Sequence, residues 1–158
     1  MDNGEELKME IGIIKGTLCV PTLVAMAITD ARTHKILPGY WLYLLAVGVG
    51  IRLCEDSLWP EGIVGGISLF LPLALAFYIT KGRMLGGGDV KLMAAAGILL
   101  GTVQGLVALL IAAVLALMVN LPKQMGKKRH GEAFAFGPYL AVGIGVCLVV
   151  GEQVEKIL

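Results

Sequence analysis

Charged side chains are scarce in this sequence. They make up 16% of its 158 residues, whereas about 25% is usual in soluble globular domains. Hydrophobic residues make up 57%, and the mean hydropathy is +0.83. This composition excludes a soluble globular domain, and it also excludes a disordered chain, which requires low hydrophobicity and high net charge. The sequence therefore predicts a membrane protein with several spanning segments.

Cysteine and net charge are also low, and each excludes a class of function. The three cysteines, Cys19, Cys54 and Cys147, show no CxxC spacing, so neither a disulfide framework nor a zinc site is predicted. The two histidines, His34 and His130, lie in basic loops without a third ligand nearby. The net charge of +1 gives no support for nucleic-acid binding. We therefore predict no metal, no organic cofactor and no nucleic-acid partner.

Apolar segments divide the chain and predict an all-α bundle of about six transmembrane helices joined by short loops. A stretch of about 20 apolar residues is long enough to cross a bilayer as a helix. We expect a single transmembrane domain over 1–158, with a very tight turn near Gly101. The expected helices cover residues 11–29, 39–54, 62–80, 89–101, 103–121 and 135–151.

The basic residues predict the orientation of these helices, because Lys and Arg in short loops favour the cytoplasmic side. If the N-terminus lies outside, three inner loops carry nine of the thirteen basic residues. These nine are Arg32, Lys35, Lys81, Arg83, Lys91, Lys123, Lys127, Lys128 and Arg129. Three of the twelve acids, Asp30, Asp89 and Glu132, lie on the same side. Asp30 then ends the first helix, and Asp89 begins the fourth.

Asp30 and Asp89 are the residues of this sequence that can carry chemistry. They share one membrane face, because an even number of crossings separates them. Two carboxyl groups that meet in a partly desolvated site hold one proton between them, as in aspartic proteases. The ionised group activates a water molecule, and the protonated group donates to the substrate. The residues alone leave two other interpretations open, which are a solvated turn residue for Asp30 and a helix N-cap for Asp89.

Three glycines precede Asp89, and Lys91 follows it. Gly86, Gly87 and Gly88 permit a close backbone approach that side chains would block, so an extended substrate can pair with this segment. Lys91 is a candidate for steering substrate or for tuning Asp89. The alternatives are a flexible loop for the glycines and an ordinary cytoplasmic-side lysine for Lys91. The segment lacks the Gly-Lys-Ser/Thr ending of a phosphate-binding loop.

Three segments together resemble the type IV prepilin peptidases, which belong to the GxGD class of intramembrane aspartyl proteases. Residues 28–40, ITDARTHKILPGY, resemble the segment that carries the family's first aspartate. Residues 85–101, LGGGDVKLMAAAGILLG, are similar to its GxGDxK segment, and residues 134–143, FAFGPYLAVG, to the segment that opens its last helix. The resemblance implies that Asp30 and Asp89 are the two catalytic aspartates.

The same resemblance implies a substrate and a location. Family members cut the leader from prepilin or pseudopilin precursors at the cytoplasmic boundary of the bacterial inner membrane. The leader is short and basic and ends in Gly, and an apolar helix follows it. Many large members also carry an N-terminal domain with paired CxxC motifs and N-methylate the new terminus. Because this sequence has no CxxC and ten residues before its first apolar segment, we expect a minimal, peptidase-only member. Its expected partners are the precursor and membrane lipid.

Two other classes of function remain open on the residues. A small ion or proton-coupled transporter would use the two aspartates to bind a cation or relay protons, and it predicts acids near the middle of the bilayer. A non-catalytic scaffold assembled through Gly-rich helices would tolerate Asp→Asn at both positions. The peptidase hypothesis instead predicts acids at helix ends. It expects them to face an inward-open, partly wet cavity, where a bound substrate helix completes the catalytic contact.

Overall fold

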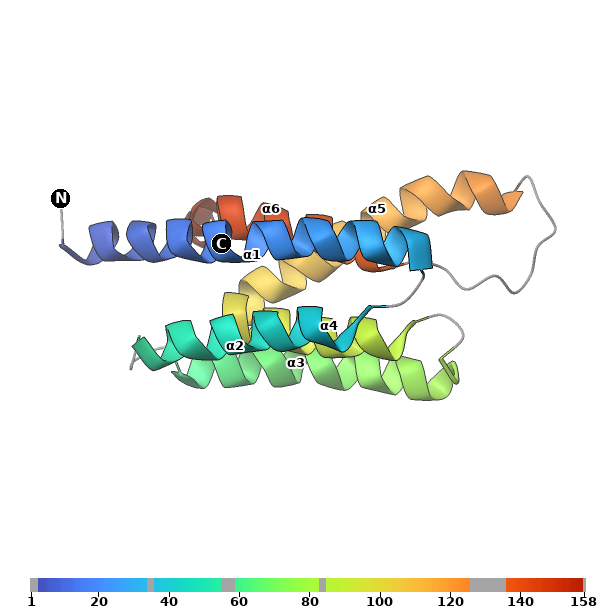
Figure 1. Ribbon diagram of the computed structural model, residues 1–158, viewed down its shortest axis with the longest axis horizontal. Helices are drawn as coiled ribbons and strands as arrows, with labels where there is room; N and C mark the ends of the chain where they lie inside the picture. The colour runs from blue at the N-terminus through green and yellow to red at the C-terminus, as the bar shows by residue number, and fades with distance from the viewer. Residues whose placement is uncertain (1–2, 34–35, 55–58, 83–84, 126–135, 158) are drawn as a thin grey trace.

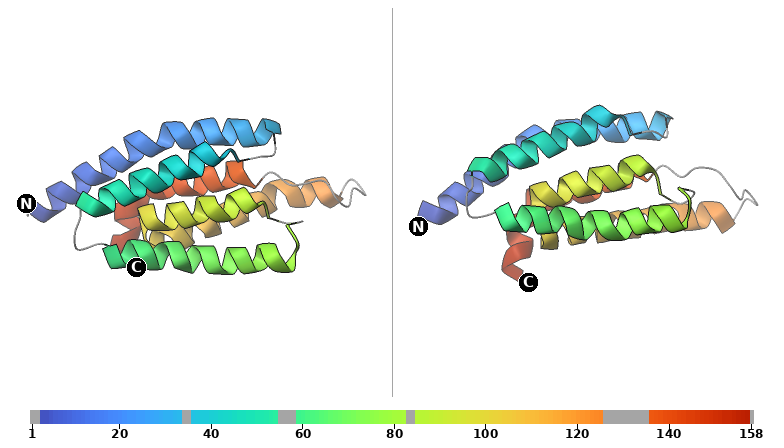
Figure 2. Two further views of the ribbon diagram at one scale, coloured as in Figure 1. Left: turned by 60° about the horizontal axis from the view of Figure 1, so that its bottom comes forward. Right: turned by 90° about the horizontal axis from the view of Figure 1, so that it is seen from below.

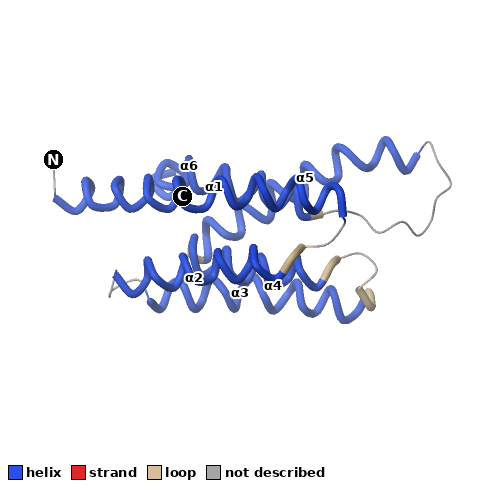
Figure 3. Tube along the Cα trace, viewed as in Figure 1, coloured by secondary structure: helices blue, strands red, loops and turns tan. Residues whose placement is uncertain are grey.

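The computed structural model is helical throughout the segments that it describes, which are residues 3–33, 36–54, 59–82, 85–125 and 136–157 apart from short turns. Its helices follow one another along the chain (Figures 1 and 3) as α1 Asn3–Thr33, α2 Pro38–Cys54, α3 Trp59–Ile79, α4 Gly87–Leu100, α5 Thr102–Met125 and α6 Gly137–Ile157. The predicted all-α bundle is confirmed. Stretches within α1, α3 and α5 are long and apolar enough to cross a membrane, and shorter apolar stretches lie in α2 and α6.

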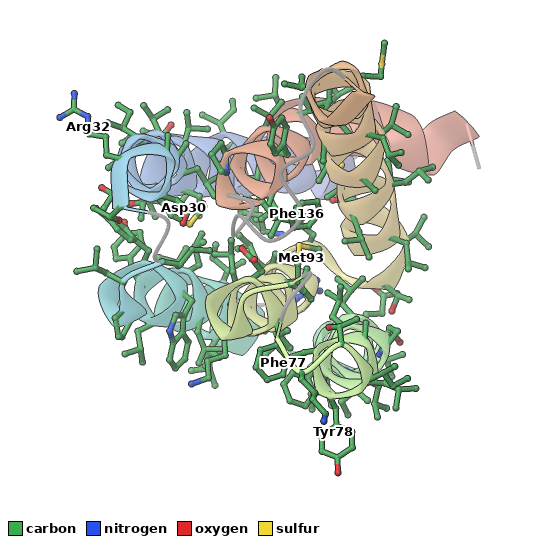
Figure 4. All side chains as sticks on the ribbon, turned by 90° about the vertical axis from the view of Figure 1, so that its right-hand side faces the viewer. Asp30, Arg32, Phe77, Tyr78, Met93 and Phe136 are labelled. Carbon is green, nitrogen blue, oxygen red and sulfur yellow. The ribbon has the colours of Figure 1, made fainter. Side chains whose placement is uncertain are left out.

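The helices are arranged in two layers. Seen from the end, α1 and α6 lie side by side above α2, α4 and α3, and α5 runs along the side of the bundle (Figure 4; Figure 2 gives two further views). α5 packs against α6 and also touches α3 and α4, so it joins the layers. The ends of α1, α3 and α5 and the starts of α2, α4 and α6 all gather at the right-hand side of Figure 1. The two predicted aspartate segments therefore lie at the same end of the bundle.

α4 is enclosed by its neighbours. Nine of its fourteen residues are buried, which is the pattern of a helix that is apolar on all sides. At about 1.5 Å per residue it is roughly 21 Å long, which is shorter than a hydrocarbon core of about 30 Å. Its backbone touches that of α3, because a Cβ placed on Gly97 would lie 2.5 Å from the carbonyl oxygen of Gly65. The absence of side chains at this crossing lets α4 sit against α3.

A tight turn and a buried arginine hold the far end of α4. Gly101 has a φ of 89°, and its N–H donates to the carbonyl oxygen of Gly97 at 2.8 Å. This confirms the predicted turn. Arg52, from the last turn of α2, is 3% exposed and donates from Nε to the carbonyl oxygen of Ile98 at 3.1 Å. A cation at a helix C-terminus is favourable because the last carbonyl groups carry partial negative charge.

Three helices, α1, α5 and α6, are clearly longer than the sequence predicts. α1 begins at Asn3 and continues to Thr33, so it does not end at residue 29. No Gly or Pro interrupts the chain between Asp30 and Pro38, and Thr33 Oγ1 donates to the carbonyl oxygen of Thr29 at 2.8 Å. α6 likewise continues to Ile157. Hydropathy marks where apolar residues stop, whereas backbone hydrogen bonds continue a helix through polar residues as well.

Candidate active site

Asp89 lies in the first turn of α4, where the backbone of its own glycine segment holds it. Its Oδ2 accepts a hydrogen bond from the N–H of Gly86 at 3.0 Å. Gly86 is the N-cap of the helix, with extended dihedral angles of −75° and 144°. This is the carboxylate half of a capping box, so Asp89 supports the helix start from its third position. Its Oδ1 is buried without a hydrogen-bond partner among the described residues and is available for a proton or a substrate.

Gly88, the residue before Asp89, is in close packing contact with Ile36. A Cβ at Gly88 would lie 2.9 Å from the Cβ of Ile36, a partly buried residue that precedes α2. At Gly87 an added Cβ would meet the Phe77 ring at 3.7 Å, which is ordinary van der Waals contact. The glycine run therefore serves close packing at Gly88, where the chain before α2 lies against the start of α4.

Asp30 lies in the last turn of α1 and points between the two layers, as do Phe136 and Met93 (Figure 4). It is 4% exposed, so the interpretation of Asp30 as a solvated turn residue is wrong. Its carboxyl group packs against Gly137, the first residue of α6: a Cβ there would lie 2.8 Å from Asp30 Cγ. The segment that opens α6 thus meets the segment of the first aspartate.

The structure brings Asp30 and Asp89 together at one end of the bundle. The two carboxyl groups are close enough to interact electrostatically, although they come from the last turn of α1 and the first turn of α4. Their side chains are 4% and 5% exposed. The site is therefore more enclosed than the inward-open, partly wet cavity that the sequence led us to expect.

The family of this chain follows from comparison with known proteins. Residues 17–121, which include both aspartates, match the type IV leader peptidase family. This chain belongs to the type IV leader peptidase family. The chain is 34% identical to the prepilin leader peptidase/N-methyltransferase of Stutzerimonas stutzeri over 140 residues, which are 84% of this chain and 48% of that relative.

Two further relatives carry the same name. The Dickeya chrysanthemi protein is 35% identical over 147 residues, which cover 89% of this chain and 52% of the relative. The Bacillus subtilis protein is 25% identical over 154 residues, which cover 96% and 61%. The chain spans about half the length of the first two relatives. No solved structure matches it.

Lys91 of this leader peptidase family member is directed to Trp41 rather than to Asp89. Residues two apart on a helix point about 200° apart, and Lys91 Nζ lies 5.4 Å from the centroid of the Trp41 ring in α2. A cation over an aromatic face is a favourable contact. The arrangement leaves a role of Lys91 in steering substrate as a prediction.

The described residues include no group of three His, Cys, Asp or Glu side chains that could hold a metal ion. His34 and His130 lie outside the described residues. Ile36 and Gly137 were not singled out individually by the sequence, although both lie in the segments that resemble the family. Their contacts with the aspartate segments are visible in the folded chain.

Proposed function

We propose that this chain is a membrane-embedded aspartic endopeptidase that removes the leader peptide from type IV pilin-like precursors. The observation that carries the proposal is the burial of Asp30 and Asp89 together at one end of the bundle. The printed names of the relatives, prepilin leader peptidase/N-methyltransferase, support the substrate class. The proposed cleavage follows the last Gly of the leader, at the boundary between the leader and the apolar helix.

The two carboxyl groups divide the work of hydrolysis. The ionised one takes a proton from water while the water oxygen attacks the scissile carbonyl carbon, and the protonated one donates to the carbonyl oxygen. The C–N bond then breaks as a proton passes to the leaving amine, which gives a carboxylic acid and a new amino terminus. Asp89 Oδ1 is suited to reach the substrate, because Gly86 holds Oδ2. Because both side chains are buried, water and substrate enter through a local opening.

The active end is assigned to the cytoplasmic side of the bacterial inner membrane, with the N-terminus outside. Among the described residues, Arg32, Lys81 and Lys91 lie next to the helix ends that gather there, as the bias of Lys and Arg toward cytoplasmic loops requires. A precursor that enters by its leader then presents its cleavage site at the same depth as the two aspartates.

Ion transport is less well supported than peptide cleavage. A cation or proton pathway across the bilayer needs ionisable groups near its middle. Asp30 and Asp89 instead lie in a last and a first helical turn at one end of the bundle. A scaffold function gives no reason for two buried carboxyl groups at the same end of the bundle.

A cleavage assay tests the proposal directly. The chain is co-expressed with a pilin-like precursor, and the leader is followed by gel shift and mass spectrometry. We expect Asp30→Asn and Asp89→Asn each to lower cleavage by about 10³-fold or more, since acid–base groups contribute about 10²–10⁴-fold each. Glu10→Gln is the matched control, because Glu10 is an exposed acid of α1 and its loss of charge leaves the site unchanged.

Each outcome of this assay has a defined meaning. Cleavage after the leader Gly that both aspartate variants abolish supports the dyad. Cleavage that survives in either variant refutes it. A product without an added methyl group supports the peptidase-only prediction, whereas a methylated product contradicts that part alone. A folded wild type that cleaves no precursor but conducts ions favours the transporter.

A further inference from the structure

Gly137 is the residue of α6 that the Asp30 carboxyl group touches. A Cβ at this position would lie 2.8 Å from Asp30 Cγ and 3.2 Å from Asp30 Cβ, and closer still to Oδ2. Real Cβ atoms essentially never come within 3.0 Å of a heavy atom outside their own residue and its two chain neighbours. The described glycines with a positive φ are Gly82 and Gly101, so the backbone conformation does not explain the glycine here. The glycine is explained instead by the space that the Asp30 carboxyl group occupies.

The start of α6 forms a firm surface for this contact. The N–H groups of Tyr139 and Leu140 both donate to the carbonyl oxygen of Phe136, at 3.1 and 3.2 Å. Pro138 restricts the backbone at the second helical position, and Leu140 is fully buried. A side chain at position 137 would therefore displace Asp30 more readily than it would displace α6.

We propose that Gly137 is a positioning residue for the catalytic pair. Because Gly137 has no side chain, the Asp30 carboxyl group packs directly against its backbone, and this contact holds the carboxyl group within reach of Asp89. The inference rests on the proposed function. Asp30 comes from α1 and Gly137 from α6, which lie in one layer, and Asp89 comes from α4 in the other layer, so the contact fixes Asp30 within its own layer, opposite the layer that carries Asp89. Gly137 acts through Asp30 and does not itself react.

The test compares Gly137→Ala with Gly145→Ala. Both residues lie on α6, but a Cβ at Gly145 meets nothing within 4 Å, so Gly145→Ala controls for the change in helix propensity. We expect Gly137→Ala to lower kcat for precursor cleavage by about 10²-fold, since misplacement by about 1 Å costs that much. The KM for the precursor stays within about twofold, because the substrate-binding surface is not changed. Gly145→Ala matches the wild type.

A second measurement separates positioning from general damage to the fold. Thermal unfolding of the purified protein is followed for Gly137→Ala in the wild-type and in the Asp30→Ala background. Asp30→Ala removes Cγ and both carboxyl oxygens, so the added methyl group should lower the Tm much less there than in the wild type.

The outcomes distinguish this inference from the proposed function. Equal kcat values for Gly137→Ala and wild type overturn the inference and leave the proposed function intact. An equal loss of Tm in both backgrounds also overturns it, since the damage would then not involve Asp30. A wild type that does not cleave the precursor overturns the proposed function, and this positioning role fails with it.

Discussion

Asp89 takes its position from residues beside it in the sequence, whereas Asp30 takes its position from a residue near the other end of the chain. Asp89 Oδ2 bonds to the N–H of Gly86 within one helical turn. Asp30 packs against Gly137, and the two meet because α1 and α6 lie side by side. One half of the site is therefore formed by local structure, and the other half requires the whole bundle.

The helices that carry the two aspartates differ in the same way. α4 is short and enclosed, and its backbone touches α3 at Gly97. α1 has 31 residues, and Ile13, Val24 and Ile28 along it are 63%, 53% and 51% exposed, as expected of a surface that faces lipid. We infer that Asp89 is the fixed half of the pair and that Asp30 is the half whose position depends on helix packing.

The largest effect is expected from the contact between α3 and α4. Gly97→Ala places a Cβ 2.5 Å from the carbonyl oxygen and 2.7 Å from the carbonyl carbon of Gly65. Neither backbone can yield without moving a helix, so we expect a loss of about 3 kcal/mol in the free energy of unfolding. Thermal and denaturant unfolding in detergent, followed by circular dichroism, measures it.

Gly16→Ala on α1 is the matched control, because a Cβ there meets nothing within 4 Å. Its stability should equal that of the wild type or exceed it slightly, since Ala is the better helix former. Equal losses of unfolding free energy in the two variants would show that α4 is no more constrained than α1. The inference that Asp89 is the fixed half of the pair would then be wrong.

A smaller effect is expected at the glycine run before Asp89. Gly88→Ala brings a Cβ to 2.9 Å from Ile36 Cβ, so the start of α4 must shift and carry Asp89 with it. We expect kcat for precursor cleavage to fall by about 10-fold or more. Gly39→Ala, at a position open to 4 Å at the start of α2, should leave it unchanged. A Gly88→Ala enzyme as active as the wild type would show that Asp89 is not held by this packing.

Removal of the Asp89 carboxyl group should cost more stability than removal of the Asp30 carboxyl group. Asp89→Ala loses the hydrogen bond from Gly86 and should cost about 1 kcal/mol, as loss of a helix cap does. Asp30→Ala relieves the same repulsion between the two carboxyl groups without breaking the Gly86 hydrogen bond, so its Tm should exceed that of Asp89→Ala. Differential scanning fluorimetry of the two variants checks this. A larger loss for Asp30→Ala would show that its contact with α6 holds the bundle together.

The sequence predicts the local features of this molecule and misses the long-range ones. Hydropathy and glycine content are enough to predict the helices and the turn at Gly101, and charge is enough to single out the two aspartates. The contacts of Asp30 with Gly137 and of Gly88 with Ile36 join segments whose separation in the chain carries no distance information. The burial of Arg52 at the end of α4 was likewise not predicted, because its partner is a backbone carbonyl group, which every residue carries.

The smallest effect is expected at Lys91, the residue of the GxGDxK segment that faces away from Asp89. Loss of its contact with Trp41 should cost under about 1 kcal/mol, because an exposed cation–π pair contributes about 0.5–1 kcal/mol. Trp41→Leu should lower the Tm more than Lys91→Met, because the Trp41 ring also packs against the hydrophobic core, but Lys91→Met should lower the Tm no further in the Trp41→Leu background. Both variants should leave kcat and KM within about fivefold of the wild type, which is the factor that an energy of about 1 kcal/mol allows. A KM that rises in Lys91→Met but not in Trp41→Leu would instead show that the ammonium group contacts the precursor. That contact would have to involve an acidic or carbonyl group, since the implied leader is itself basic.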